Sequence, residues 1–178
     1  MKRETVGLLA VVALVGAGFF FWRRMRWKRE HYPPNSQAAI DLFTEAARLN
    51  GQPEEWGSSP GLHNVLRRES AGWVGRPNFT YGQGNAGQRF GSDISSTDSR
   101  ERWPEVWDEL KAGTKGAKST ATGLGQLILG NTETYYPEGA QGIGDPMQEA
   151  RGMLNYIESR YGDPENAWEM YGTQFAGY

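Results

Sequence analysis

The chain has 178 residues, 38% of them apolar and 12% aromatic, which is enough for one domain with a hydrophobic core plus an appendage. It has no cysteine and only two histidines, so disulfides are excluded and a zinc site would need mostly carboxylate ligands. We therefore predict no metal and no cofactor. The net charge of -2 is unevenly divided, because seven basic residues and one Glu precede Glu30. The remainder is acidic, and we expect no nucleic-acid partner.

An uncharged run covers residues 6–22, and at roughly 1.5 Å per residue it just spans the hydrocarbon of a bilayer. Basic residues interleaved with Trp22 and Trp27 follow, as at a membrane interface. A cleaved signal peptide is the competing interpretation, but residues 19–24 are bulky where cleavage needs small side chains. We expect an uncleaved single-pass membrane helix at 6–22, within an anchor region of residues 1–29, with the lipid bilayer as its partner.

Paired prolines at 33 and 34 predict an extended linker over residues 30–35, so the folded domain is expected to span residues 36–178. Its first helix is predicted to run to Asn50, capped by Ser36 or Asn35 and ended by Gly51.

A second helix is predicted to start at Ser59-Pro60, and its apolar face continues through Leu66 to Glu69 by three- and four-residue spacing. A carboxyl group where an apolar helix opens into loops can be partly dehydrated. Its pKa then rises, and the group can act as a general acid near neutral pH. On spacing alone, the simpler interpretation is a surface glutamate at a fraying helix end. Other motifs are needed to favour catalysis.

The next segment, residues 75–118, is rich in Gly, Ser, Asn and Asp, with turn or hairpin sequences at 82–85 and 92–96 and a short helical piece at 103–110. Long irregular segments are often binding loops, so this one is expected to form a wall of a cleft, with disorder as the alternative. After it, residues 123–126 read Gly-Leu-Gly-Gln. Here glycine permits close backbone approach, and the amide can hydrogen-bond sugar hydroxyls.

The last segment predicts two helices. Asp145, Pro146 and Gln148 form an N-cap, a first-turn proline and a capping-box glutamine, and Gly162 ends the helix that they begin. A further helix starts at Asp163-Pro164 and carries Trp168 and Tyr171. The Met residues of these helices are expected in the core. The two aromatic side chains suit either a core or a wet cleft wall.

Three blocks, residues 68–73, 121–127 and 145–168, resemble in order the motifs of soluble-lytic-transglycosylase-type domains, especially those of bacteriophage virion and tail proteins. The resemblance covers roughly residues 58–178. It implies a mainly α, lysozyme-like α+β domain with a small turn and hairpin region, here preceded by the transmembrane helix. The implied activity is cleavage of the β-1,4 bond between N-acetylmuramic acid and N-acetylglucosamine in peptidoglycan glycan strands, with a 1,6-anhydro product.

By the same resemblance, Glu69 matches the single catalytic glutamate and Ser70 a residue that orients it. Gln126 matches a ligand of the substrate near the cut. Gly125 stands where relatives often carry methionine or another apolar residue, which implies a thinner cleft wall. Trp168 stands where many relatives have a tyrosine. We expect substrate binding by Ser70, Gly125, Gln126, Trp168 and Tyr171.

Two alternatives remain. A lysozyme-type hydrolase would need a second carboxylate, for which Asp93 and Asp98 are available. An inactive, membrane-anchored structural protein of a virion would only bind glycan. The basic residues after the apolar run favour a cytoplasmic domain, which conflicts with a cell-wall substrate. We expect the enzyme to act from a virion membrane or the host inner membrane, with other virion proteins as further partners.

Overall fold

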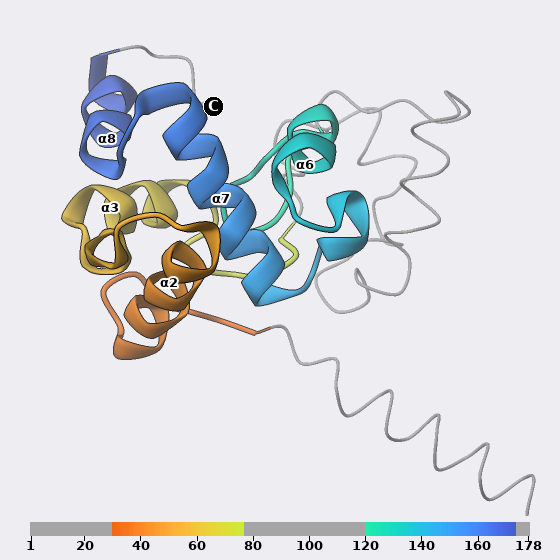
Figure 1. Cartoon of the computed structure of the whole chain (residues 1–178), viewed down its shortest axis with the longest axis horizontal. Helices are drawn as coiled ribbons and strands as arrows, with labels where there is room; N and C mark the ends of the chain where they lie inside the picture. The colour runs from red at the N-terminus through yellow and green to blue at the C-terminus, as the bar shows by residue number, and fades with distance from the viewer. Residues whose placement is uncertain (1–29, 77–119, 174–178) are drawn as a thin grey trace, which may run out of the picture.

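A computed structural model of the chain describes residues 30–76 and 120–173 (Figure 1). These ranges are mainly helical, which confirms the predicted class at that level: they contain five α-helices and two short 3-10 helices. Strand-like pairing in them is limited to two isolated antiparallel bridges, between His31 and Trp73 and between Thr122 and Leu127. The expected turn and hairpin region falls almost entirely on residues 77–119, which lie outside the described residues, and the lysozyme-like α+β fold stays a prediction.

The first two helices begin and end where the sequence predicts. Helix α2 spans Gln37–Asn50; the Ser36 side chain accepts a hydrogen bond from the N–H of Ala39, and Gly51 ends the helix at φ +75°. A 3-10 helix, η1 (Glu54–Ser58), leads into helix α3 (Pro60–Glu69). Ser59 caps α3 through the N–H of Leu62, with Pro60 in its first turn. The predicted caps are therefore confirmed.

The second described range is also helical. Its elements are α6 (Leu129–Tyr135), η3 (Gly139–Gly142), α7 (Pro146–Tyr161) and α8 (Pro164–Thr173). The Asp145 side chain accepts from the N–H groups of Met147 and Gln148, and Gly162 ends α7 at φ +85°. Asp163 accepts from the N–H of Asn166 at the start of α8. These boundaries agree with the sequence-based prediction.

The predicted capping box at the start of α7 is wrong, because Gln148 does not bond the N–H of Asp145. The backbone N–H of Asp145 donates to the carbonyl of Gly142, in the 3-10 turn η3. The Gln148 side chain, predicted to accept from that N–H, accepts from the N–H of Glu138 instead. The preceding turn already satisfies the capping donor, which frees the glutamine to hold the turn itself.

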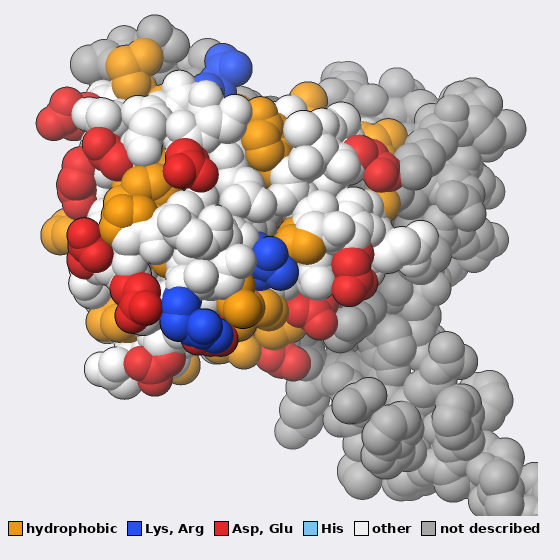
Figure 2. All heavy atoms as spheres, in the orientation of Figure 1, with side chains coloured by type: hydrophobic (Ala, Val, Ile, Leu, Met, Phe, Trp, Pro, Cys, Tyr) orange, Lys and Arg blue, Asp and Glu red, His pale blue; other side chains and the backbone are white. Residues whose placement is uncertain are grey.

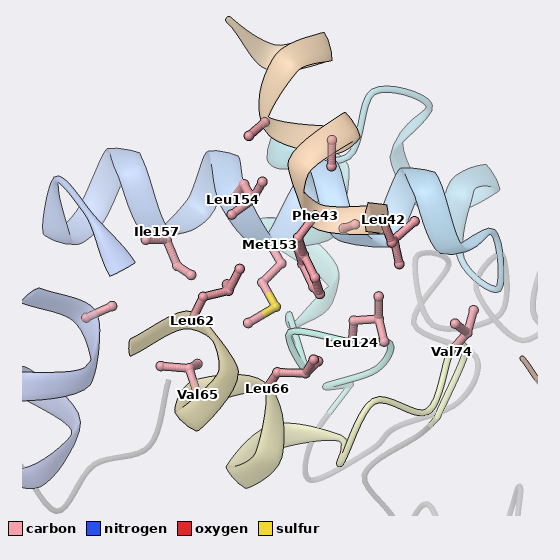
Figure 3. Close-up of a cluster of buried hydrophobic side chains, with 14 residues drawn as sticks. Leu42, Phe43, Leu62, Val65, Leu66, Val74, Leu124, Met153, Leu154 and Ile157 are labelled. Carbon is pink, nitrogen blue, oxygen red and sulfur yellow. The ribbon is translucent and has the colours of Figure 1, made fainter. Parts of the chain in front are cut away.

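Helix α7 runs through the centre of the described part, where it contacts α2, α6 and α8, and α3 contacts α8 (Figure 1). Figure 3 shows Met153 of α7 among the side chains of α2 and α3, with Leu124 reaching the same cluster from a loop. This core therefore fixes both the end of α3 and the loop that carries Leu124. The cluster comprises Leu42, Phe43, Ala46, Ala47, Leu62, Val65, Leu66, Val74, Leu124, Ala150, Met153, Leu154, Ile157 and Ala167.

The segment predicted as a linker, residues 30–35, is docked on the domain. The N–H of Tyr32 donates to the carbonyl of Gly72 at 2.8 Å, and the N–H of Val74 donates to the carbonyl of Glu30 at 3.1 Å. Between these bonds the rings of His31 and Trp73 stack, with centroids 4.0 Å apart. The folded part therefore includes Glu30, six residues before the expected start at Ser36.

No helix within residues 30–76 and 120–173 is long and apolar enough to cross a membrane. The predicted anchor at residues 6–22 lies outside those ranges, as do Asp93, Asp98 and the helical piece at 103–110. On the face drawn in Figure 2, acidic side chains are spread over the described surface and basic ones are few. This agrees with the negative charge counted from the sequence after residue 29.

Candidate active site

Glu69 is the last residue of α3, at the point where the apolar face of that helix meets the surface. Leu62, Val65 and Leu66 on that face are fully buried, whereas the Glu69 side chain is half-buried. Burial raises the pKa of Glu69 to about 7, against the lowering effects of a hydrogen bond from Tyr171 and the positive charge of Arg68. A substantial fraction of the carboxyl groups is therefore protonated at neutral pH.

Tyr171 of α8 makes the direct contact with this carboxyl group. Its hydroxyl donates to Oε1 of Glu69 at 2.8 Å. The ring of Tyr171 stacks on Trp168, with centroids 5.9 Å apart and planes 26° apart, and Cζ of Arg68 lies 5.5 Å from the Tyr171 centroid. Burial and, to a smaller extent, the charge and hydrogen bond of Glu69 raise the pKa of the Tyr171 hydroxyl to about 12. The hydroxyl therefore stays a donor.

Trp168 packs against the hydrophobic core and is half-buried. The resemblance predicts a tyrosine at this position, and the indole of Trp168 cannot replace a hydroxyl that both donates and accepts. One helical turn further on, Tyr171 brings a hydroxyl to Glu69. The sequence singled out both aromatic residues but did not show which of them contacts Glu69.

Ser70 is fully buried and holds the turn that follows Glu69. Its hydroxyl accepts from the N–H of Gly72 at 3.1 Å, and its carbonyl accepts from Nη1 of Arg76 at 3.1 Å. The contacts described for Ser70 thus fix the backbone next to Glu69. Its expected contact with substrate stays a prediction.

Gln126 is buried, with φ +49°, in the loop after Ala121. Its Nε2 donates to the carbonyl of Arg76 at 2.6 Å and to that of Gly123 at 2.9 Å. The amide therefore ties its own loop to the residues that follow Glu69. Substrate binding by Gln126 stays a prediction beside this structural role.

Gly125 lies against helix α7. A Cβ atom there would stand 3.0 Å from Cγ and 3.1 Å from Cβ of Met153, which is fully buried. A side chain at this position would point into the core between loop and helix. The expectation of a thinner cleft wall is corrected on this point, because the atoms that glycine lacks would face Met153. The glycine allows the loop to approach α7 closely.

Glu149, which was not among the predicted site residues, is fully buried in α7. Its carboxyl group accepts hydrogen bonds from the backbone N–H groups of Gly75, Leu124 and Gly144. The spacing from Glu149 to Met153 is four residues, so the pattern placed this carboxyl on the buried face of a helix. The helical spacing could therefore have shown that Glu149 is buried. It could not show the hydrogen-bond partners of Glu149, which lie up to 74 positions away in the sequence.

The chain matches no protein-family model. Neither a curated protein nor a solved structure shows significant similarity to it.

Proposed function

We propose that the protein is a peptidoglycan lytic transglycosylase in which Glu69 is both the acid and the base. The observation that carries the proposal is a half-buried carboxyl group with a pKa of about 7, held by the Tyr171 hydroxyl. These properties suit a group that must give up a proton and then take one back near neutral pH. The order of the sequence motifs supplies the substrate class.

In the proposed reaction, protonated Glu69 donates its proton to the oxygen of the β-1,4 bond. The bond from C1 of the muramoyl residue to that oxygen breaks, and the N-acetylglucosamine side leaves with a free 4-hydroxyl. The Glu69 carboxylate then accepts the proton of the muramoyl 6-hydroxyl while O6 bonds to C1. This closes the 1,6-anhydro ring and restores the protonated acid. No water is consumed.

The surroundings of the carboxyl groups support one catalytic acid. Glu149 is the one fully buried carboxyl among the described residues, and three backbone N–H groups occupy its oxygens. A retaining or inverting hydrolase usually needs a second carboxylate opposite the acid. Asp93 and Asp98 lie outside the described ranges. A hydrolase is therefore the alternative outcome of the test below.

The membrane anchor and the virion location are part of the same proposal. An apolar run at residues 6–22 followed by basic residues would hold an acidic domain near an anionic lipid surface. The domain would then act on the cell wall close to the membrane. Protease digestion of the domain from outside intact spheroplasts would contradict packaging in a virion as the route to the wall.

The experiment is digestion of purified sacculi by the full-length protein in detergent micelles, followed by mass analysis of the muropeptides. Anhydro ends are expected, whereas reducing ends would identify a hydrolase. Glu69→Gln should reduce the rate by about 10²–10⁴-fold, the usual contribution of general acid catalysis. Glu45→Gln, on the outer side of α2 and paired with Arg48, is the matched control and should keep the rate. Folded wild-type protein that binds glycan without cutting it would favour the structural alternative.

A further inference from the structure

The buried carboxyl group of Glu149 contacts three separate parts of the backbone. Its Oε1 accepts from the N–H of Gly75 at 2.9 Å and from that of Gly144 at 2.6 Å. Its Oε2 accepts from the N–H of Leu124 at 2.9 Å and also lies 3.1 Å from the nitrogen of Gly75. Each oxygen thus serves two residues. A side chain on one helix thereby fixes three irregular segments.

Two of these segments belong to the candidate active site. The first loop, residues 70–76, directly follows Glu69, and the second loop, residues 121–127, contains Gln126. They also touch each other, since the N–H of Gly123 donates to the carbonyl of Arg76 at 3.0 Å. Glu149 lies against both loops through Gly75 and Leu124. It is therefore placed to set the position of one half of the site relative to the other.

The first loop connects Glu149 to Glu69 through a few residues. Gly75, held by Glu149, is followed by Arg76, whose Nη1 donates to the carbonyl of Ser70 at 3.1 Å. Ser70 is the C-cap of α3 and adjoins Glu69. A shift of Gly75 would therefore move the residue next to the catalytic carboxyl. A displacement of about 1 Å can cost a catalyst roughly 10²-fold in rate.

The space around Glu149 allows little adjustment. A Cβ atom on Gly123 would stand 2.8 Å from Cδ of Glu149 and 2.6 Å from Oη of Tyr136, so the loop backbone lies directly on the carboxyl. The titratable groups that face it are Tyr136 and Asp145. Burial raises the pKa of Glu149 to about 7, and the hydrogen bonds from Gly144, Gly75 and Leu124 oppose the rise.

We propose that Glu149 is a positioning residue, whose carboxyl group binds the first loop to the second and so holds Glu69 and Gln126 in their relative places. This inference rests on the proposed function for its catalytic part. Glutamine has nearly the shape of glutamate, but one of its terminal atoms is a donor. Because each oxygen of Glu149 accepts from two residues, Glu149→Gln would set an N–H group against backbone N–H groups of at least one loop.

The test compares full-length wild-type protein and Glu149→Gln in detergent micelles. Amide hydrogen exchange is followed by NMR at pH 8, where the wild-type carboxyl is mostly ionised. Cleavage of soluble, uncrosslinked glycan strands gives kcat and KM. The matched control is Tyr136→Phe. It removes a buried hydroxyl that lies beside the same carboxyl and has no hydrogen-bond partner among the described residues. The control should keep both the wild-type exchange and the wild-type kcat.

For Glu149→Gln we expect faster exchange at Gly75, Leu124 and Gly144, with the amides of α7 still protected. We also expect kcat to fall by up to about 100-fold, with KM changed much less, since the chemistry is displaced more than the binding surface. Unchanged exchange at the three amides, or an unchanged kcat in an active protein, overturns the inference about Glu149. If the wild-type protein cuts no peptidoglycan but Glu149→Gln still exchanges these three amides faster, only the catalytic assignment is overturned.

If Glu149→Gln does not fold, amide hydrogen exchange in the wild-type protein tests the inference about Glu149. Amides bound to a buried carboxyl should be protected nearly as strongly as those of α7. Exchange of the Gly75 and Leu124 amides at the rate of exposed loop amides would show that Glu149 does not hold the two loops together.

Discussion

The Tyr171 hydroxyl donates a 2.8 Å hydrogen bond to Oε1 of Glu69 across 102 positions of sequence. This bond joins the ends of α3 and α8 and selects one orientation of a half-buried carboxyl group. It also favours the ionised form of Glu69, while burial favours the protonated form, and burial has the larger effect. The pKa of about 7 is the balance of burial against this bond and the positive charge of Arg68.

The activity should therefore decrease as the pH rises through about 7, because the general acid must be protonated to act. Tyr171→Phe removes a donor that stabilises the carboxylate, so the pKa of Glu69 should rise and the alkaline limb of kcat/KM should move to higher pH. The maximal rate should fall by about tenfold, the effect of losing a hydrogen bond worth roughly 1.4 kcal/mol in the transition state. The measurement is a pH profile of kcat/KM for both proteins.

The control for that prediction is Tyr135→Phe. The Tyr135 hydroxyl bonds to Ser159 on the exposed side of α6 and α7, so its removal should leave the pH profile as it is. An alkaline limb that stays in place in Tyr171→Phe, or moves equally in the control, would mean that the bond seen here does not tune Glu69.

The free energy of unfolding should also depend on pH in the range around 7. The pKa values of Glu69 and Glu149 are raised from 4.5 to about 7, so both groups take up protons on folding at intermediate pH. The stability linked to this uptake is fully present below about 4.5 and is lost as the pH rises through about 7. Thermal unfolding should therefore shift to lower temperature between pH 5.5 and pH 8.

The matched variant for this prediction is Glu69→Gln, which cannot titrate. Its unfolding temperature should change less between the two pH values than that of the wild type, while Glu45→Gln should follow the wild type. Equal pH dependence in wild type and Glu69→Gln would show that Glu69 does not take up a proton on folding.

Much of the helical framework was readable from local sequence. Caps such as Ser59 and Asp145 and the helix end at Gly162 act within a few residues, so their patterns specify the boundaries. The place of Glu69 at the edge of an apolar stripe follows from helical spacing in the same way. Local rules therefore placed this carboxyl group at the edge of the core, whereas its proposed catalytic role rests on the resemblance of the motifs.

The contacts that give the site its properties join distant positions. The bond from Tyr171 to Glu69 and the bonds from Gly75 and Leu124 to Glu149 depend on how helices pack. No spacing rule indicates which aromatic residue of α8 faces α3. The docking of residues 30–32 was also unreadable, because paired prolines predict an extended segment without saying what it pairs with.

Gly123 provides a stability test of the crowded loop. Its φ is +78°, and a Cβ atom would stand 2.6 Å from Oη of Tyr136 and 2.8 Å from Cδ of Glu149. Gly123→Ala therefore combines backbone strain with overpacking, and should destabilise the protein by about 2–4 kcal/mol. Gly130→Ala in α6 is the control, because a Cβ atom there meets nothing within 4 Å. The control should be neutral or stabilising by up to about 1 kcal/mol. Urea unfolding measures both, and similar midpoints for the two variants would contradict the described loop.

Gly72 tests whether residues 30–32 hold the loop that follows Glu69. Its φ is +84°, and a Cβ atom would clash with the carbonyl of Tyr32, whereas Gly51, at φ +75°, has open space. Both alanine variants place a side chain at a similar left-handed φ, so their difference mainly reports the contact with the docked segment. We expect Gly72→Ala to lose amide protection at Tyr32 and Val74, whose N–H groups make the pairing, and to be less stable than Gly51→Ala by at least about 1 kcal/mol.

If the docked segment also steadies Glu69, glycan cleavage by Gly72→Ala should fall relative to Gly51→Ala when both are assayed below their unfolding temperatures. The pairing lies three to five residues beyond Glu69, close enough for its loss to loosen the turn at Ser70. Equal protection at Tyr32 in both variants would show that the segment does not pair with Gly72 in solution. Lost protection with undiminished cleavage would instead confine the pairing to stability.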